Sequence, residues 1–234
     1  MKLKKKDFIE IDFTAKFKDS GEVFDSSLKS ELQKLNPNAI AKPFIFSLGQ
    51  NMFLKGVDNF LIGKTIEKFP IDYKIELTPK NAFGLRDPKL VQMIPMKVFK
   101  EHNINPLPGV SLNFDGKIAK ILTVSGGRTM VDFNNPLAGK ELVYEIKILR
   151  KIDDLNEKIR AFNDFLFKKD LKFKTENKKL ILEVEKGLKS LIELFKDKYK
   201  DVLGLELEVK ENIQEKQGKK ENLKENKETE AEIK

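Results

Sequence analysis

Alternating apolar and polar residues mark the first part of the chain as β structure. In residues 7–18 ("DFIEIDFTAKFK"), apolar side chains from Ile9 to Phe17 share one face, and Phe8 alone breaks the period of two. Shorter apolar runs follow at "EVFDSS", "FIFSL" and "KFPIDYKIELTP", each next to glycine, proline or serine. These patterns predict half-buried strands that are joined by turns.

One short amphipathic helix is predicted over residues 51–61. Its apolar residues recur at spacings of three and four: Phe53, Leu54, Val57, Phe60 and Leu61. Gly56 lies inside this pattern, where glycine costs roughly 1 kcal/mol relative to alanine. We therefore expect Gly56 to mark a close approach between the helix and another segment.

The pattern changes over residues 88–132, which predict a small inserted unit. "PMKVFKEH" can form one or two helical turns, and Asp115-Gly116 between two apolar runs is a strong hairpin signal. A turn at "SGGR" and a strand at "TMVDF" follow. Residues 140–152 then resume the first sheet, so the small unit is predicted to lie between two strands of one sheet.

A separate α-β-β-α-β unit is predicted over residues 153–211. Asp154 and Glu157 have capping-box spacing, and one helix face follows at Leu155, Ile159, Phe162 and Leu166. A hairpin, one amphipathic helix ("EKGLKSLIELFKDKYKDVLG") and a strand ("LELEV") complete it. A unit of this size has a marginal core, so we expect it to dock on a partner or on its own copy.

Composition excludes several kinds of chemistry. The chain has no Cys and one His, His102, so thiol catalysis, thiolate metal sites and a His cluster are absent. No GxSxG motif is present. No apolar run approaches the roughly 20 residues of a membrane span, and the basic start has no apolar signal segment. We expect a cytoplasmic protein.

The charge is basic but spread out. The net charge is +8, and Lys and Glu are abundant while Cys and Trp are absent, as in many hyperthermophile proteins. Nucleic acid is a third hypothesis for the partner, but the basic residues do not form the one Arg-rich stripe that would favour it. Residues 212–234 are rich in Lys and Glu, which predicts a disordered tail.

Several ordered blocks resemble the FKBP family of peptidyl-prolyl isomerases. They read "DFTAKFKDSGEVFDSS", "KPFIFSLGQNMFLKGVDNFLIG", "NAFG" and "LVYEIKIL". "NAFGLRDPKLVQMIPMKVF" and "VDFNNPLAGKELVYEI" resemble the SlyD-type branch, in which an insert-in-flap chaperone domain replaces a surface loop. The unit after residue 152 is similar to the extra C-terminal domain of long-chain archaeal members.

The resemblance implies an α+β fold, in which an antiparallel FKBP-type sheet wraps on a short helix. A small β-rich domain is inserted, and a separate α+β domain follows. The expected division is an FKBP domain in two parts (1–85 and 133–152), an insert-in-flap domain (86–132), a C-terminal domain (153–211) and a charged tail (212–234).

The resemblance also implies a substrate pocket that is lined by aromatic side chains. The catalytic positions carried over from the family are Phe24, Asp25, Phe83 and Tyr144. The substrate-binding positions are Phe13, Phe44, Phe53, Leu54, Val57 and Leu137. Because isomerisation needs no proton transfer, Asp25 is expected to position or polarise rather than to act as a general base.

Three positions depart from the family pattern. Val57 stands where the family usually has a floor Trp, Phe83 replaces the Tyr of the "AYG" turn, and Phe13 replaces the first-strand Tyr. The apolar wall is kept, but two hydroxyls are lost. These losses put tight binding of macrolide inhibitors in doubt and motivate an alternative function, a binding-only holdase chaperone with little isomerase activity.

The insert is expected to carry a chaperone surface. The residues proposed for it are Met93, Met96, Phe99, Phe114 and Met130. Methionine is adaptable and frequent on promiscuous binding surfaces. The expected partners are unfolded or proline-containing polypeptides, with a homodimer through residues 153–211 as a further hypothesis. The His-rich tail of the SlyD type is absent, so neither a metal nor a cofactor is expected.

Overall fold

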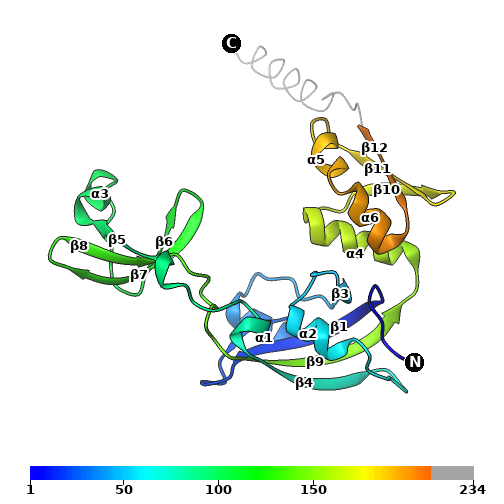
Figure 1. Cartoon of the computed structure of the whole chain (residues 1–234), viewed down its shortest axis with the longest axis horizontal. Helices are drawn as coiled ribbons and strands as arrows, with labels where there is room; N and C mark the ends of the chain where they lie inside the picture. The colour runs from blue at the N-terminus through cyan, green and yellow to red at the C-terminus, as the bar shows by residue number, and fades with distance from the viewer. Residues whose placement is uncertain (212–234) are drawn as a thin grey trace, which may run out of the picture. The chain divides into compact units, whose positions relative to one another are not determined.

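The computed structural model describes residues 1–211, and the chain divides into two compact units with the boundary between Ile152 and Asp153. The first unit contains two separate sheets, and the second contains one (Figure 1). Each unit is α+β, which agrees with the fold class predicted from the sequence. Within residues 1–211, no helix is long and apolar enough to span a membrane.

The main sheet of the first unit is antiparallel and has five strands in the order β2-β1-β9-β4, with β3 pairing with β1. β1 is central because its first half pairs with β3, its second half pairs with β2, and its whole length pairs with β9. The strands are β1 (Phe8–Phe17), β2 (Val23–Ser26), β3 (Phe44–Ser47), β4 (Ile71–Leu77) and β9 (Leu142–Ile152).

Helix α2 (Lys55–Leu61) packs against one face of this sheet (Figure 1). It begins later than the predicted 51–61, because Asn51 has a positive φ of 55° and Leu54 is extended. Gly56 confirms the expected close approach: a Cβ there would lie 2.7 Å from the backbone oxygen of Asn81. The helix therefore rests directly on the segment that follows β4.

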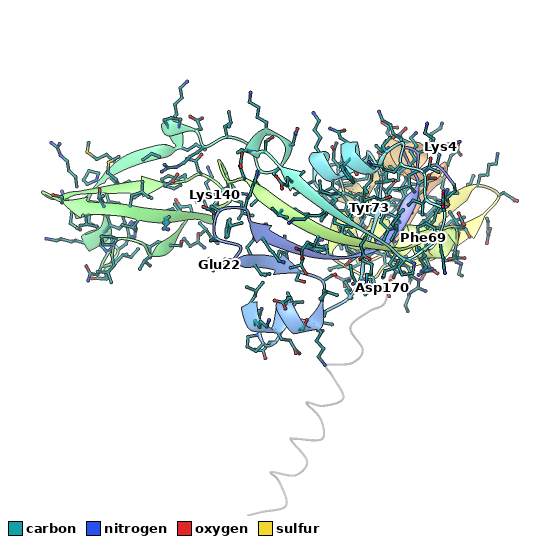
Figure 2. The ribbon with its side chains drawn as sticks, turned by 90° about the horizontal axis from the view of Figure 1, so that it is seen from below. Lys4, Glu22, Phe69, Tyr73, Lys140 and Asp170 are labelled. Carbon is teal, nitrogen blue, oxygen red and sulfur yellow. The ribbon has the colours of Figure 1, made fainter. Side chains whose placement is uncertain are left out.

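A second helix, α1 (Lys29–Leu35), follows β2 and was not predicted. It buries no residue of its own and stands off the sheet (Figure 2). Leu28, Leu32 and Leu35 have helical spacing, so a signal for this helix was present in the sequence.

Residues 91–132 form the second sheet, with the strand order β5-β8-β7-β6. Asp115 and Gly116 both have positive φ, so the predicted two-residue hairpin is confirmed. The helical turns predicted near residue 96 are also present, whereas β5 was not predicted. The elements are β5 (Val91–Pro95), α3 (Met96–Glu101), β6 (Ser111–Phe114), β7 (Lys117–Ser125) and β8 (Arg128–Asp132).

The second unit packs helices on a three-stranded sheet with the order β10-β11-β12. The predicted cap is confirmed, since the Asp154 carboxylate accepts the Glu157 N–H at 2.8 Å. The predicted face of α4 buries Ile159 and Phe162, while Leu155 is exposed. The elements are α4 (Leu155–Phe167), β10 (Lys172–Glu176), β11 (Lys179–Val184), α5 (Lys189–Glu193), α6 (Lys196–Leu203) and β12 (Glu206–Glu211).

The prediction of one long helix near residues 185–204 is wrong, because the helix is broken between α5 and α6. At the break, the Phe195 ring meets Phe167 at 5.4 Å between ring centroids. Tyr199 on α6 packs on Phe162 at 5.0 Å, and its hydroxyl donates a hydrogen bond to Asn163. A change of direction lets both rings reach α4. The predicted charged tail, 212–234, lies outside the described residues.

Candidate functional site

A cluster of aromatic rings lies between the main sheet and the start of α2. Tyr144 is at its centre: its ring lies 6.2 Å from Phe24, 6.0 Å from Phe13 and 5.6 Å from Phe53. Phe44 extends the cluster with a contact of 5.4 Å to Phe53. The five rings come from β1, β2, β3, β9 and the segment before α2, and all five were predicted site residues. We call them the aromatic cluster.

Strand register explains why Asp25 joins this cluster. Ala15 on β1 pairs with Asp25 on one side and with Tyr144 on the other. Directly opposed residues in a sheet point to the same face, so the Asp25 carboxylate and the Tyr144 phenol share a face. The small, buried Ala15 between them leaves room for both.

A β-bulge then brings Phe24 to the same site. The register shifts so that Ala15 faces Asp25 while Lys16 faces Val23, which leaves Phe24 as the extra residue. In a regular strand, Phe24 and Asp25 would point to opposite faces. A bulge re-aims a side chain, and here the Phe24 ring lies edge-on to Tyr144 and 5.0 Å from Phe17.

The surroundings of Asp25 and Tyr144 raise the pKa of both side chains. Desolvation raises the pKa of the Asp25 carboxyl, and a hydrogen bond from the Ser26 backbone only partly opposes this. Burial also raises the pKa of the Tyr144 phenol, and the negative charge of the nearby Asp25 makes a smaller contribution in the same direction. Tyr144 therefore keeps its proton across the physiological range, and it is a hydroxyl donor beside an acid.

Helix α2 supplies the apolar floor. Val57 is fully buried and Leu54 is half-buried. Val57 is smaller than the Trp that the resemblance described above implies at this position. The Phe13 and Phe53 rings of the aromatic cluster lie 5.4 Å apart.

An acid that the sequence did not single out lies next to this floor. Asp58 is 3% exposed, and its Oδ1 has no hydrogen-bond partner. Burial raises its pKa to about 6, although the Gly49 N–H donates to the carboxylate. Through that bond, Asp58 ties α2 to the loop that leads towards Phe53. A charged residue at a buried helix position was the available sequence signal.

Two loops carry the remaining predicted site residues, Phe83 and Leu137, which are both half-buried. The loops are joined where the Gly139 N–H donates to the Gly84 carbonyl at 2.9 Å. No ring contact joins Phe83 to the aromatic cluster, and Leu137 has no ring, so the part of both residues in the site stays a prediction. Within residues 1–211, no group of three or more His, Asp or Glu residues could hold a metal ion.

The proposed chaperone residues of the insert divide between its surface and its core. Met93 and Met130 are cross-strand partners on β5 and β8, and Met93 is 54% exposed. Phe99, at 2% exposed, is buried in the core with Ala119, Ile121 and Val131, so its prediction as a surface residue is wrong. α3 turns it inward to cover the sheet.

Met96 and Phe114 are partly buried against the same core. Ile118, which was not predicted, is 67% exposed on β7. It lies on the face opposite the core, since its neighbour Ala119 points inward. Met93, Met130 and Ile118 thus lie on the open face of the insert sheet, opposite its core.

An antiparallel sheet on one short helix, with an aromatic cluster between them and a second sheet inserted before the last strand, defines an FKBP-type domain. A family model described as the IF domain of FKBP26 matches residues 92–137. The short-type peptidyl-prolyl cis-trans isomerase of Methanocaldococcus jannaschii is 31% identical over 150 residues, which cover 62% of this chain and 92% of the relative.

Two bacterial relatives agree. A probable FKBP-type 16 kDa peptidyl-prolyl cis-trans isomerase of Pseudomonas fluorescens is 30% identical, covering 46% of this chain and 71% of its own. The isomerase SlyD of Helicobacter pylori is 26% identical, covering 64% and 76% respectively. The chain therefore belongs to the FKBP-type family of peptidyl-prolyl cis-trans isomerases, a family of enzymes.

Proposed function

We propose that this protein isomerises prolyl peptide bonds at the aromatic cluster and captures unfolded chains on its insert. The observation that carries the first part is the packing of Phe24, Phe13, Phe53 and Phe44 around Tyr144, with Asp25 at the edge. Aromatic rings of this kind form an apolar wall against which a proline ring packs. Membership of the family supports the same reading.

The chemistry needs binding rather than a reactive group. Rotation about a peptide bond has a barrier of about 18–20 kcal/mol, because the C–N bond has partial double-bond character. A site that binds the twisted amide better than the planar forms lowers this barrier. A thousandfold acceleration needs only about 4 kcal/mol. No nucleophile, metal or cofactor is required for this reaction.

The test is the cis/trans exchange rate of an X-Pro tetrapeptide, measured by NMR with and without the protein. Uncatalysed exchange takes tens to hundreds of seconds, so acceleration is easily resolved. Unchanged exchange at stoichiometric protein would contradict the isomerase function. Retained suppression of client aggregation in the same sample would instead support the binding-only holdase, which the missing hydroxyls at Phe13 and Phe83 favour.

The second part rests on the open face of the insert. Met93 and Ile118 are large apolar residues that are mostly exposed, and Met130 lies beside Met93. Changing Met93 and Ile118 to serine should weaken capture of an unfolded client without altering tetrapeptide exchange. Ile40→Ser is a matched control, because Ile40 is 88% exposed but belongs to the loop after α1. Undiminished capture by the double variant would contradict this assignment.

We also propose that the second unit pairs with a second copy of itself. Leu191 and Leu194 are exposed at helical spacing near the break between α5 and α6. Leu194→Lys should then lower the mass measured by light scattering, while Ile40→Lys should not. A monomer mass that is independent of concentration in the unmodified protein would contradict pairing.

A further inference from the structure

Two chain segments connect the main sheet to the insert sheet, and together we call them the neck: residues 84–90 and 132–139. The ladder between β4 and β9 ends at the pair Leu77–Leu142, and the ladder of the insert begins at the pair Val91–Asp132. No strand pairing joins the segments between those two points. Apart from a single 3-10 turn at Pro88–Leu90, neither segment has regular secondary structure of its own between those points.

Side chains supply the missing pairing. The Asp87 N–H donates to Asn134 Oδ1 at 2.8 Å, and Asn134 Nδ2 donates to the Asp87 carbonyl at 2.9 Å. The Asn134 amide thus satisfies both backbone groups of Asp87, as a neighbouring strand would. An aspartate at this position would have no donor, and a leucine would have neither a donor nor an acceptor. Asn134 is also more than nine-tenths buried.

Asp132 extends this bonding in two directions. Its Oδ1 accepts the Asn134 N–H at 2.9 Å and Nδ2 at 2.7 Å. Its Oδ2 accepts Nε of Arg86 at 2.9 Å and a terminal nitrogen of Arg86 at 2.7 Å. Desolvation opposes the charge, but the bonds from Asn134 and Arg86 lower the pKa of this carboxyl below its ordinary value. Asp132 is therefore ionised while the neck is bonded.

Backbone bonds close the neck at both ends. The Phe133 N–H donates to the Leu90 carbonyl at 2.9 Å, next to the insert. The Gly139 N–H donates to the Gly84 carbonyl at 2.9 Å, next to the "NAFG" turn. Between these two bonds, the side chains of Asn134 and Asp132 bond to Asp87 and Arg86 of the other segment. Hydrogen bonds therefore link the two segments along the length of the neck.

We propose that the neck is a stiff joint, in which Asn134 and Asp132 are positioning residues that couple client capture to isomerisation. The inference rests on the proposed function, because it needs a capture site and a reaction site. A joint of fixed geometry raises the local concentration of a captured proline at the second site only while that geometry is held. Loosening the joint leaves each site intact and weakens their cooperation.

The joint can be measured without any assay of activity. The chain has no cysteine, so Glu67→Cys and Lys117→Cys would place two spin labels, one on the main domain and one at the hairpin tip of the insert. With the labelled protein diluted into an excess of unlabelled protein, so that a second copy adds no label, pulsed electron spin resonance should give one narrow distance distribution. Asn134→Ala should broaden it, while Asn105→Ala, an exposed position in the insert, should not. An equally narrow distance distribution in Asn134→Ala would overturn the proposal that Asn134 keeps the neck stiff.

The coupling is measured as a ratio of two rates: refolding of a proline-limited protein client and exchange of a tetrapeptide. Asn134→Ala and Arg86→Ala should lower this ratio by about threefold or more, with tetrapeptide exchange and client binding unchanged. Arg128→Ala is the charge-matched control. An unchanged ratio overturns the coupling. If the unmodified protein does not accelerate exchange of the tetrapeptide, the proposed function is wrong. The distances between the spin labels would still test whether the neck is stiff.

Discussion

Asp25 and Tyr144 occupy one cross-strand row of the main sheet, on either side of Ala15, and point to the same face. Neither residue lies near the other in the sequence. The phenol of Tyr144 remains beside the acid where Phe13 and Phe83 have no hydroxyl. The Asp25 carboxylate and the Tyr144 hydroxyl are the two polar groups beside the rings, and the contribution of each to turnover can be tested separately.

Phe24 should matter more than Asp25 for turnover. Phe24→Ala removes an aromatic wall that contacts Tyr144 and Phe17, and we expect about a tenfold loss in kcat/KM, which corresponds to about 1.4 kcal/mol. Asp25→Ala removes a polar group at the edge and should cost less. Tetrapeptide exchange measured by NMR checks both variants. Equal losses, or a larger loss for Asp25→Ala, would contradict the ranking.

The Tyr144 hydroxyl should act in the chemical step. Tyr144→Phe keeps the ring contacts with Phe13 and Phe53 but removes the phenol, so we expect kcat to fall severalfold, with little change in KM. Tyr73→Phe is the matched control, because Tyr73 packs on Phe60 outside the aromatic cluster. Steady-state kinetics on one tetrapeptide separate the two parameters. Turnover of Tyr144→Phe equal to that of the control would show that the hydroxyl is not used.

Gly56→Ala should destabilise the protein, although alanine favours an isolated helix by roughly 1 kcal/mol. The new Cβ would lie 2.5 Å from Leu77 and 2.7 Å from the Asn81 carbonyl oxygen, and the backbone cannot give way cheaply. Overpacking of this kind costs about 1–3 kcal/mol. Chemical denaturation measures the change in free energy of unfolding.

Asn59→Ala provides the comparison for Gly56→Ala. Asn59 lies on the exposed side of α2, where the same new residue should be neutral or stabilising. If Gly56→Ala were as stable as Asn59→Ala, α2 would have room to move away from the 77–81 segment, and the close packing would not be required.

Asp58 should make the protein less stable as the pH rises from about 4 to about 6. The pKa of its carboxyl is raised from 3.8 to about 6 in the folded state, so folding favours the protonated form. The stabilisation is complete below the unfolded pKa and is lost as the pH passes through the folded pKa. A pKa difference of about 2 corresponds to at most about 3 kcal/mol.

Asp58→Asn should remove this contribution, because the amide can still accept the Gly49 N–H and carries no charge. The free energy of unfolding, measured by denaturant titration at several pH values, should be higher in the variant at pH 7 and should converge with the unmodified protein near pH 4. Glu67→Gln, an exposed acid, should show no such difference. Parallel curves for Asp58→Asn and the unmodified protein would refute the buried charge.

The sequence alone determined the elements whose signals are local. Alternation located β1, Asp115-Gly116 fixed a hairpin, and Asp154 capped its helix, because each depends on neighbouring residues. Ordered motifs also indicated the five rings of the aromatic cluster. Gly56 signalled a close contact, since a helix otherwise disfavours glycine.

Only the tertiary structure decided which side chains share a face and which are covered. A bulge opposite Ala15 turned Phe24 towards Tyr144, which no period-two pattern can show. Packing of α3 buried Phe99 and left Ile118 exposed. The bonding of Asn134 to Asp87 joins residues that are far apart in the chain. Register, burial and long-range hydrogen bonds depend on contacts between distant segments, and so they arise only when the chain folds.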